Sequence, residues 1–159
     1  MNENTDVYFT FFLGEGAFAI DVQSVKEVLT FESITTVPRA APYMRGVMNI
    51  RGSVVSIIDF RTLFNIPSTT AENELSIIVT EVDAEGDSPL CFGVIADKVE
   101  EVESLDMLDR SDSIMGGDLS LSNQFIKKLG KKGDQFVLIL DMEKILRYIE
   151  DDLAQQNRA

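Results

Sequence analysis

Short apolar runs separated by turn-forming residues make up most of the chain. The runs are four to eight residues long and rich in β-branched and aromatic side chains, a pattern that is typical of strands. Glycine, proline, asparagine or aspartate stands between most of them, as hairpin turns require. We expect strands at 7–13, 17–21, 47–50, 54–58, 75–82, 90–96, 125–129 and 136–140. The pattern therefore predicts a mainly β fold.

Two helices are expected, and each follows an aspartate that can cap its first turn. Asp59 precedes a short helix and Asp141 a longer C-terminal one. Apolar residues follow both aspartates at the same offsets: Phe60, Leu63 and Phe64 in one case, Met142, Ile145 and Leu146 in the other. This repetition indicates two similar β lobes. We expect one domain of two lobes over 7–153, with flexible ends at 1–6 and 154–159.

Three other segments are less regular. Valines at positions 22, 25 and 28 are compatible with either a short helical turn or a twisted strand. An acidic hairpin loop is expected at 83–87, and an irregular polar segment at 108–122. Cys91 lies inside an apolar strand, so we expect a buried thiol.

The stretch 37–61 contains the most distinctive charge. Arg51 lies between two apolar strands and next to Gly52 and Ser53, which favour a tight turn. Core packing requires no arginine at the end of a strand pair. Arg51 is therefore either a solvent-facing turn residue or an anchor in a protein interface. Glu27 is the other charge in apolar surroundings, and we expect it to hold the Arg51 guanidinium in a bidentate pair.

The amino-acid composition limits the classes of molecule that the protein is expected to bind. The chain has 14 basic and 27 acidic residues, a net charge of −13, which disfavours nucleic acid and anionic lipid. The single cysteine cannot form an internal disulfide, which fits a reducing, cytoplasmic location. The N-terminal residues do not resemble a secretion signal, and no apolar run approaches the roughly 20 residues that cross a bilayer. We expect no membrane insertion.

The sequence gives little indication of catalysis or metal binding. The chain has no histidine, which removes the commonest general base and metal ligand. The acid-rich segment 97–112 lacks the ligand spacing of a calcium loop and fits a solvated acidic face. We expect no metal, no cofactor and no enzymatic activity. A small acidic hydrolase that uses a carboxylate pair stays as the alternative from another functional class.

Three motifs occur in order along the chain. The first is an aromatic strand, a glycine turn and I-D-x-x-x-V-x-E-V at 20–28. The second is G-V-M-N-I-R-G at 46–52, followed by a strand and D-F-R at 59–61. The third is G-D at 133–134, a strand ending in L-D, and E-K-I-L at 143–146. Together they resemble the CheW family, the coupling proteins of bacterial chemotaxis, with Ser56 in place of the usual proline.

The resemblance implies both a fold and a function. The fold would be two intertwined five-stranded SH3-like β-barrels with short helices and a C-terminal helix. The function would be that of a non-catalytic adaptor in chemotaxis signalling. It would couple chemoreceptors to the chemotaxis histidine kinase CheA. The partners would be the CheA regulatory domain and the cytoplasmic tip of a methyl-accepting chemoreceptor, held in a groove between the barrels. A coupling protein of the same fold in a non-motility chemosensory pathway is the alternative.

The resemblance also implies the residues that bind these partners. Arg51 and Glu27 would form the family's arginine–glutamate pair. The receptor-binding set would be Val25, Glu27, Arg51, Val99 and Val102. The partner-binding motif would be Gly46, Asn49, Ile50 and Gly52.

Overall fold

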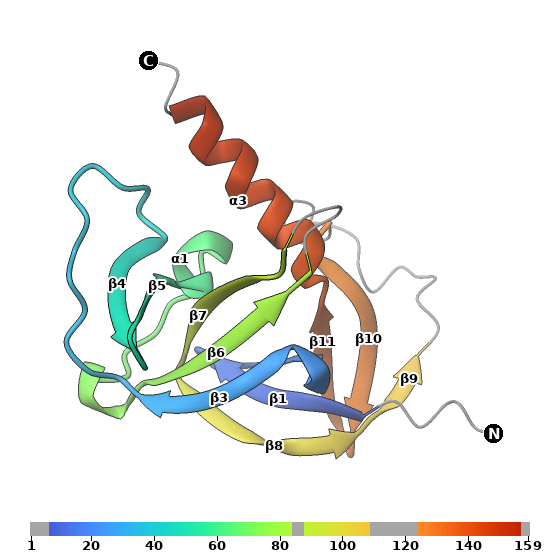
Figure 1. The fold of residues 1–159 in the computed structure, drawn as a ribbon. Coiled ribbons are helices and arrows are strands. Elements are labelled where there is room, and N and C mark those ends of the chain that lie inside the picture. Colours follow the sequence, from blue (N-terminus) through green and yellow to red (C-terminus); the bar gives the residue numbers. More distant parts are fainter. Residues whose placement is uncertain (1–6, 84–87, 109–123, 157–159) are drawn as a thin grey trace.

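The computed structural model describes residues 7–83, 88–108 and 124–156 (Figure 1). Two curled β-sheets form its two lobes, and a helix near the C-terminus runs out from the end of one of them. Most of the acidic loop and most of the irregular segment expected from the sequence, at 84–87 and 109–123, lie outside the described residues.

The first lobe is a sheet of six strands in the order β8-β1-β2-β11-β10-β9. Its strands are β1 (Val7–Leu13), β2 (Gly16–Asp21), β8 (Lys98–Ser104), β9 (Asp106–Leu108), β10 (Ile126–Lys132) and β11 (Gln135–Leu140). Only Leu105 separates β8 from β9, so the two act as one bent strand. This bent strand pairs with β1 at one end and with β10 at the other, which closes the sheet into a barrel.

The second lobe is a sheet of five strands in the order β3-β6-β7-β5-β4. Its strands are β3 (Val25–Thr30), β4 (Met44–Ile50), β5 (Ser53–Ile58), β6 (Ser76–Val82) and β7 (Leu90–Ala96). Beyond β3, Thr35 exchanges two backbone hydrogen bonds with Val47 of β4, at 2.9 and 2.8 Å. This bridge draws the two edges of the curled sheet together.

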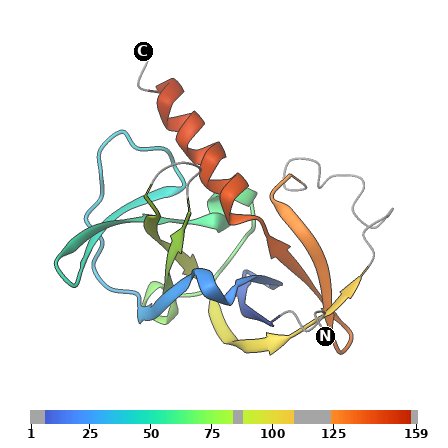
Figure 2. The ribbon, with the colours of Figure 1, turned by 45° about the vertical axis from the view of Figure 1, so that its right-hand side comes forward.

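The two lobes share one topology. The antiparallel hairpin β1–β2 corresponds to β6–β7, and the parallel pair β2·β11 corresponds to β7·β5. The chain crosses from the first sheet to the second after β2 and returns after β7, so each lobe receives an edge strand from the crossover (Figure 2). The expected pair of intertwined, similar barrels is confirmed.

The helices begin at the expected aspartates. Helix α1 (Phe60–Phe64) is capped by Asp59, whose side chain accepts a hydrogen bond from the Arg61 backbone N–H at 2.9 Å. Helix α3 (Met142–Gln156) is capped by Asp141, which accepts from the Lys144 N–H at 3.1 Å. Because α3 runs through Gln156, it overlaps the first residues of the expected C-terminal tail. Among the described residues, no helix is long and apolar enough to cross a membrane.

The ambiguous valine segment contains both expected structures. A 3-10 turn, η1 (Val22–Ser24), is followed directly by β3. A second short turn, η2 (Glu72–Glu74), lies in the segment before β6. Strand β10 runs three residues beyond its expected end, so the β10–β11 turn is confined to Gly133 and Asp134.

A shared hydrophobic core joins the lobes. Phe11 and Ile20 of the first lobe pack with Ile58 and Phe92 of the second, and α3 adds Ile145. Smaller apolar clusters fill the two barrels separately. The expectation of a buried Cys91 is wrong, because its side chain is exposed. Cys91 lies near the start of β7, where the first two residues are exposed and the following five are buried.

Candidate partner-binding site

The β4–β5 hairpin ends in a two-residue turn made by Arg51 and Gly52. Ile50 pairs with Ser53, so Ser53 begins β5 and is not part of the turn. Both turn residues have positive φ, 53° for Arg51 and 88° for Gly52, as a type I′ hairpin turn requires. The side-chain oxygen of Asn49 accepts a hydrogen bond from the Gly52 N–H at 3.0 Å and closes the turn.

The predicted bidentate pair between Arg51 and Glu27 is confirmed. Arg51 Nε donates to Glu27 Oε2 at 3.0 Å, and Nη2 donates to Oε1 at 2.8 Å. Glu27 belongs to β3 and Arg51 follows β4, and these are the two edge strands of the second sheet. The ion pair therefore crosses the seam of the barrel. The Arg51 side chain is nevertheless 78% exposed, so its remaining N–H groups can reach a partner.

The ion pair favours the charged form of the Glu27 carboxylate. The hydrogen bond from Arg51 lowers the pKa of Glu27 below its usual value, and the positive charges of Arg51 and Lys26 act in the same direction against the opposing effect of burial. Exposed ion pairs contribute little to folding stability. The geometry of the pair is therefore better suited to presenting a fixed charged surface than to holding the fold together.

The three predicted valines have different environments. Val25 and Val99 are half-buried and pack against the core that both lobes share. Val102 is 49% exposed on β8. Strands β3 and β8 hold equivalent positions in the two lobes and run along the same side of the molecule (Figures 1 and 2).

Two exposed apolar residues near the pair were missed from the sequence. Val28 follows Glu27 on β3, and Val54 follows the turn on β5 with 75% of its surface exposed. The V-x-x-V spacing marked Val28 as apolar, but the side of the strand that it occupies depends on the pairing with β6. Short apolar runs give no indication of which positions a neighbouring strand covers.

The residues of the predicted partner-binding motif have structural roles within the hairpin. Gly46 has φ +145°, and a Cβ atom there would lie 2.2 Å from the Thr35 carbonyl oxygen. Ile50 is buried in the second barrel, and Asn49 and Gly52 close the turn. The four residues thus build the hairpin that carries Arg51. A direct role for them in partner binding stays a prediction.

A second charged cluster lies beside α1 and was not predicted from the sequence. Arg61 binds Asp59 through Nε and Nη2, at 2.9 and 3.0 Å, and its Nη1 reaches Asp97 at 3.3 Å. Arg45 adds a hydrogen bond to Asp59 at 3.2 Å. Burial raises the pKa of Asp59, but the hydrogen bonds and charge of Arg61, with the charge of Arg45, outweigh it and hold the pKa below its usual value. Only the D-F-R motif hinted at part of this cluster.

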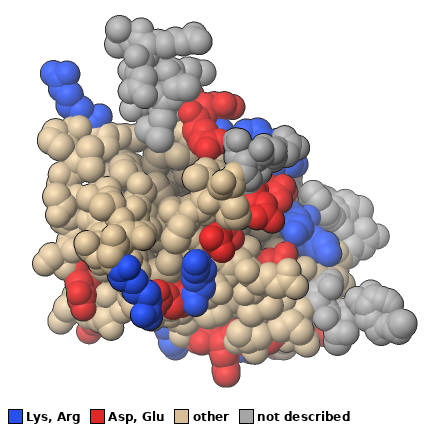
Figure 3. All heavy atoms as spheres, in the orientation of Figure 1, with Lys and Arg blue, Asp and Glu red and all other residues tan. Residues whose placement is uncertain are grey.

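One part of the second lobe's visible face is poor in charge. In Figure 3 the part of the visible face over β4 and β5 carries few charged side chains, whereas charges of both signs gather lower down. Within the described part of the chain, no group of three or more His, Cys, Asp or Glu side chains is placed to hold a metal ion. An exposed arginine beside apolar surface is typical of protein interfaces.

Comparisons with known proteins agree with this fold. Residues 7–150 match the family described as CheW-like domain. The chemotaxis protein CheW of Klebsiella aerogenes is 25% identical over 139 residues, which are 87% of this chain and 80% of that protein. CheW of Treponema pallidum is 24% identical over 91% of this chain and 84% of its own length.

A solved structure shows the same architecture. The scaffolding protein TtCheW from Thermoanaerobacter tengcongensis superposes with a TM-score of 0.70 at 23% identity, covering 88% of this chain and 86% of that one. Proteins of the matched family are non-catalytic adaptors, so the chain is not expected to act as an enzyme. The family match therefore argues against the alternative of a carboxylate-pair hydrolase. The family match spans nearly all of the described residues, and the chain belongs to the CheW family of chemotaxis coupling adaptors.

Proposed function

We propose that this adaptor couples a chemoreceptor to the histidine kinase CheA in bacterial chemotaxis. It would bind the cytoplasmic tip of a methyl-accepting receptor and the regulatory domain of the kinase, and it would work in the cytoplasm. The Arg51–Glu27 pair carries the proposal, because it fixes an exposed guanidinium at the tip of a hairpin beside exposed apolar side chains. Arginine with apolar neighbours is a frequent anchor of protein interfaces.

The receptor side of the proposal uses strands β3 and β8. Glu27, Val25 and Val28 come from β3, and Val99 and Val102 come from β8. A receptor coiled coil presents amphipathic helices, which bind apolar grooves with charged rims. We expect each contact to be weak, with a Kd of about 1 μM, and to be strengthened by avidity in an array.

A purified receptor-tip fragment and a purified kinase regulatory domain test the proposal. Isothermal titration of the wild type should show binding to both. Arg51→Ala should weaken binding of the receptor fragment about 30-fold, the effect of losing roughly 2 kcal/mol at an interface anchor. Lys144→Ala on α3 is the matched control, since it also removes one exposed positive charge but lies on another element. The proposal is wrong if the wild type binds neither partner.

A double-mutant cycle tests the role of the pair itself. Glu27→Ala, Arg51→Ala and the double variant are compared for affinity to the receptor fragment. Because Glu27 holds the Arg51 fork, the single losses should be non-additive, with a coupling of about 0.5–3 kcal/mol. Arg51→Lys keeps the charge but loses the planar fork, and it should recover only part of the affinity. Additive losses would show that the two residues act separately.

A coupling protein of a non-motility chemosensory pathway would use the same surfaces. The outcome for the two partners separates these functions. Binding to a receptor and kinase of another signalling system, with none to chemotaxis partners, would favour the alternative pathway.

A further inference from the structure

The chain crosses between the lobes twice, and an aspartate stands at each crossing. Asp21 ends β2 before the chain enters β3, and Asp97 follows β7 before the chain enters β8. The two crossings are equivalent, because β2 corresponds to β7 and β3 to β8 in the shared topology, although the strand pairings align Asp97 with Gln23 and not with Asp21. The strands that they lead into carry the apolar residues of the proposed receptor groove.

Asp97 is tightly held. Its side chain is only 5% exposed, and its backbone N–H donates to the Phe12 carbonyl oxygen at 2.9 Å. The carboxylate accepts the Gly14 N–H at 2.7 Å and Arg61 Nη1 at 3.3 Å, and it also accepts the Ser68 hydroxyl. One carboxylate thus joins the β1–β2 turn, helix α1 and the segment after α1 at the point where β8 begins.

The segment after α1 lies directly on the β1–β2 turn. A Cβ atom at Gly14 would come within 2.6 Å of the Pro67 carbonyl oxygen, so the two backbones are in close contact there. Ser68 follows Pro67 and donates to Asp97. Charge-assisted hydrogen bonds in a buried site are stronger than those at the surface. The start of β8 is therefore fixed from both lobes.

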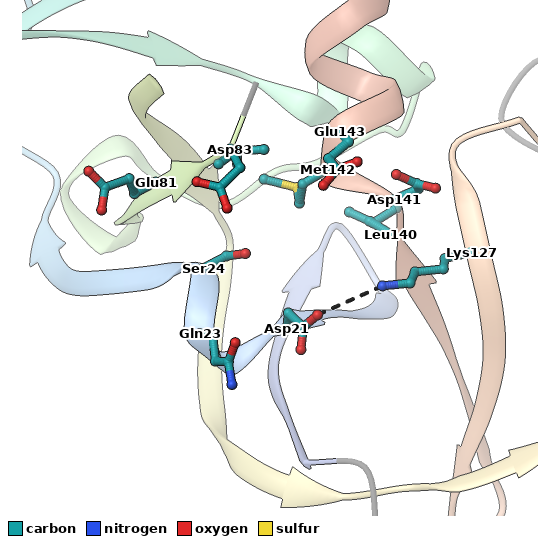
Figure 4. A pocket seen from close by; sticks show the side chains of 11 residues that line it. Asp21, Gln23, Ser24, Glu81, Asp83, Lys127, Leu140, Asp141, Met142 and Glu143 are labelled. Atoms are coloured by element: carbon teal, nitrogen blue, oxygen red, sulfur yellow. Dashed lines mark ion pairs between the residues drawn. The ribbon is translucent and has the colours of Figure 1, made fainter. Parts of the chain in front are cut away.

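Asp21 has a different environment. Its side chain is 52% exposed, and it forms an ion pair with Lys127 at 3.7 Å. It makes no side-chain cap to the following turn, η1. Figure 4 shows Asp21, Gln23 and Ser24 on one side of a cavity of about 430 Å³, with Asp141 and Glu143 across it. Asp97 also lines a cavity, of about 500 Å³, but its carboxylate accepts hydrogen bonds from Gly14, Arg61 and Ser68, whereas the exposed Asp21 carboxylate is paired with Lys127.

We infer that Asp97 is a positioning residue: it fixes the start of β8, and with it Val99 and Val102, in one wall of the proposed receptor groove. This inference rests on the proposed binding of a receptor in that groove. The rest of β8 is held by its ladder with β1 and by a hydrogen bond from Thr10 Oγ1 to the Glu101 carbonyl at 2.8 Å. Loss of the Asp97 contacts should therefore loosen the start of the strand without unfolding it.

Hydrogen exchange tests the positioning without any partner. In Asp97→Asn, the amides at the start of β8 should exchange about tenfold faster. The loss of the carboxylate's hydrogen bonds makes local opening of this part of the strand more frequent. Ser68→Ala removes one donor from an exposed position and should give a smaller change of the same kind. Asp21→Asn is the matched control at the equivalent crossing and should leave β8 unchanged. Unchanged exchange in both Asp97→Asn and Ser68→Ala would overturn the inference.

Binding measurements separate positioning from stability. With all variants folded by circular dichroism, Asp97→Asn should bind the receptor fragment about two- to thirtyfold more weakly, the usual range for coupling through a packed element. Binding of the kinase domain should be unchanged. Equal loss for both partners, or no loss for either, would overturn the positioning role while leaving the proposed function intact. If the wild type does not bind the receptor fragment, the proposed function fails, and the receptor part of this inference fails with it.

Discussion

Two arginines ten positions apart show how differently one residue type can act in this protein. Arg51 is exposed and, among the described residues, pairs with the Glu27 carboxylate, whereas Arg61 is nearly buried and contacts both Asp59 and Asp97. An exposed pair adds little to stability, but breaking a buried pair leaves an uncompensated charge. Arg51 is therefore available for binding, and Arg61 is committed to the fold.

Removal of Asp59 should show the stability that the buried cluster provides. Because Asp59→Ala leaves Arg61 and Arg45 without their shared carboxylate, we expect a loss of about 3–5 kcal/mol in the free energy of unfolding. Urea denaturation measures it. Glu74→Ala, at an exposed position on η2, is the control and should change stability by less than about 0.5 kcal/mol.

The pH dependence of stability follows from the same carboxylate. The pKa of Asp59 is lower in the folded chain than its usual value, so its contribution to stability is present above about pH 4 and is lost as the pH falls further. Burial raises the pKa of Asp97, but hydrogen bonds from Ser68, Gly14 and Thr70 and the charge of Arg61 outweigh it, so Asp97 acts in the same direction. The free energy of unfolding should therefore fall steeply with acid in the wild type. In Asp59→Asn the slope should be shallower, and an equal slope would contradict this account.

At the level of elements, the β4–β5 hairpin depends on two glycines for different reasons. Gly46 has positive φ and lies against the backbone of Thr35, while Gly52 has positive φ in a turn with no atom within 4 Å of an added Cβ. Both positions disfavour a side chain for conformational reasons, but only Gly46 also lacks space. The bridge between Thr35 and Val47 depends on this close approach.

Alanine substitutions at the two glycines separate the cost of the backbone conformation from the cost of the missing space. Gly52→Ala should cost about 1–2 kcal/mol from backbone strain alone. Gly46→Ala should cost about 1–3 kcal/mol more, because the added carbon overlaps the Thr35 segment. Thermal denaturation of both variants provides the comparison. Equal losses would show that the 34–35 segment can move aside without cost.

At the scale of the whole molecule, the two lobes share one core. The cluster that contains Phe11, Ile58 and Ile145 takes side chains from both sheets and from α3. The crossing strands also make each sheet incomplete without chain from the other half of the sequence. Neither lobe should therefore fold alone.

We expect a single cooperative unfolding transition for the whole chain. Phe60→Ala, at a fully buried position of the shared core, should lower the free energy of unfolding by about 3–5 kcal/mol. It should do so equally for probes in either lobe, such as amides of β10 and of β6. Calorimetry and hydrogen exchange check this. Two separate transitions in the wild type or the variant would contradict the shared core.

Local patterns in the sequence predicted eight of the eleven strands in the described residues, the helix caps and the hairpin that carries Arg51, because these depend on neighbouring residues alone. They left β3 ambiguous and did not identify β8 and β9. The strand 90–96 and the caps at Asp59 and Asp141 are present as expected. The bidentate partner of Arg51 was also identified, with the family resemblance as a guide. The roles of the valines and of the hairpin motif in binding are not decided by local pattern and await measurement.

Only the tertiary structure decided which distant segments meet. The bridge at Thr35 and the cluster around Asp97 both depend on contacts between segments that are separated in the sequence. An apolar run predicts a strand but not its neighbours, since a shift of one residue in register exchanges its buried and exposed faces. Asp97 appeared in the sequence as one acid among many, and its buried position is a consequence of the crossing between the lobes.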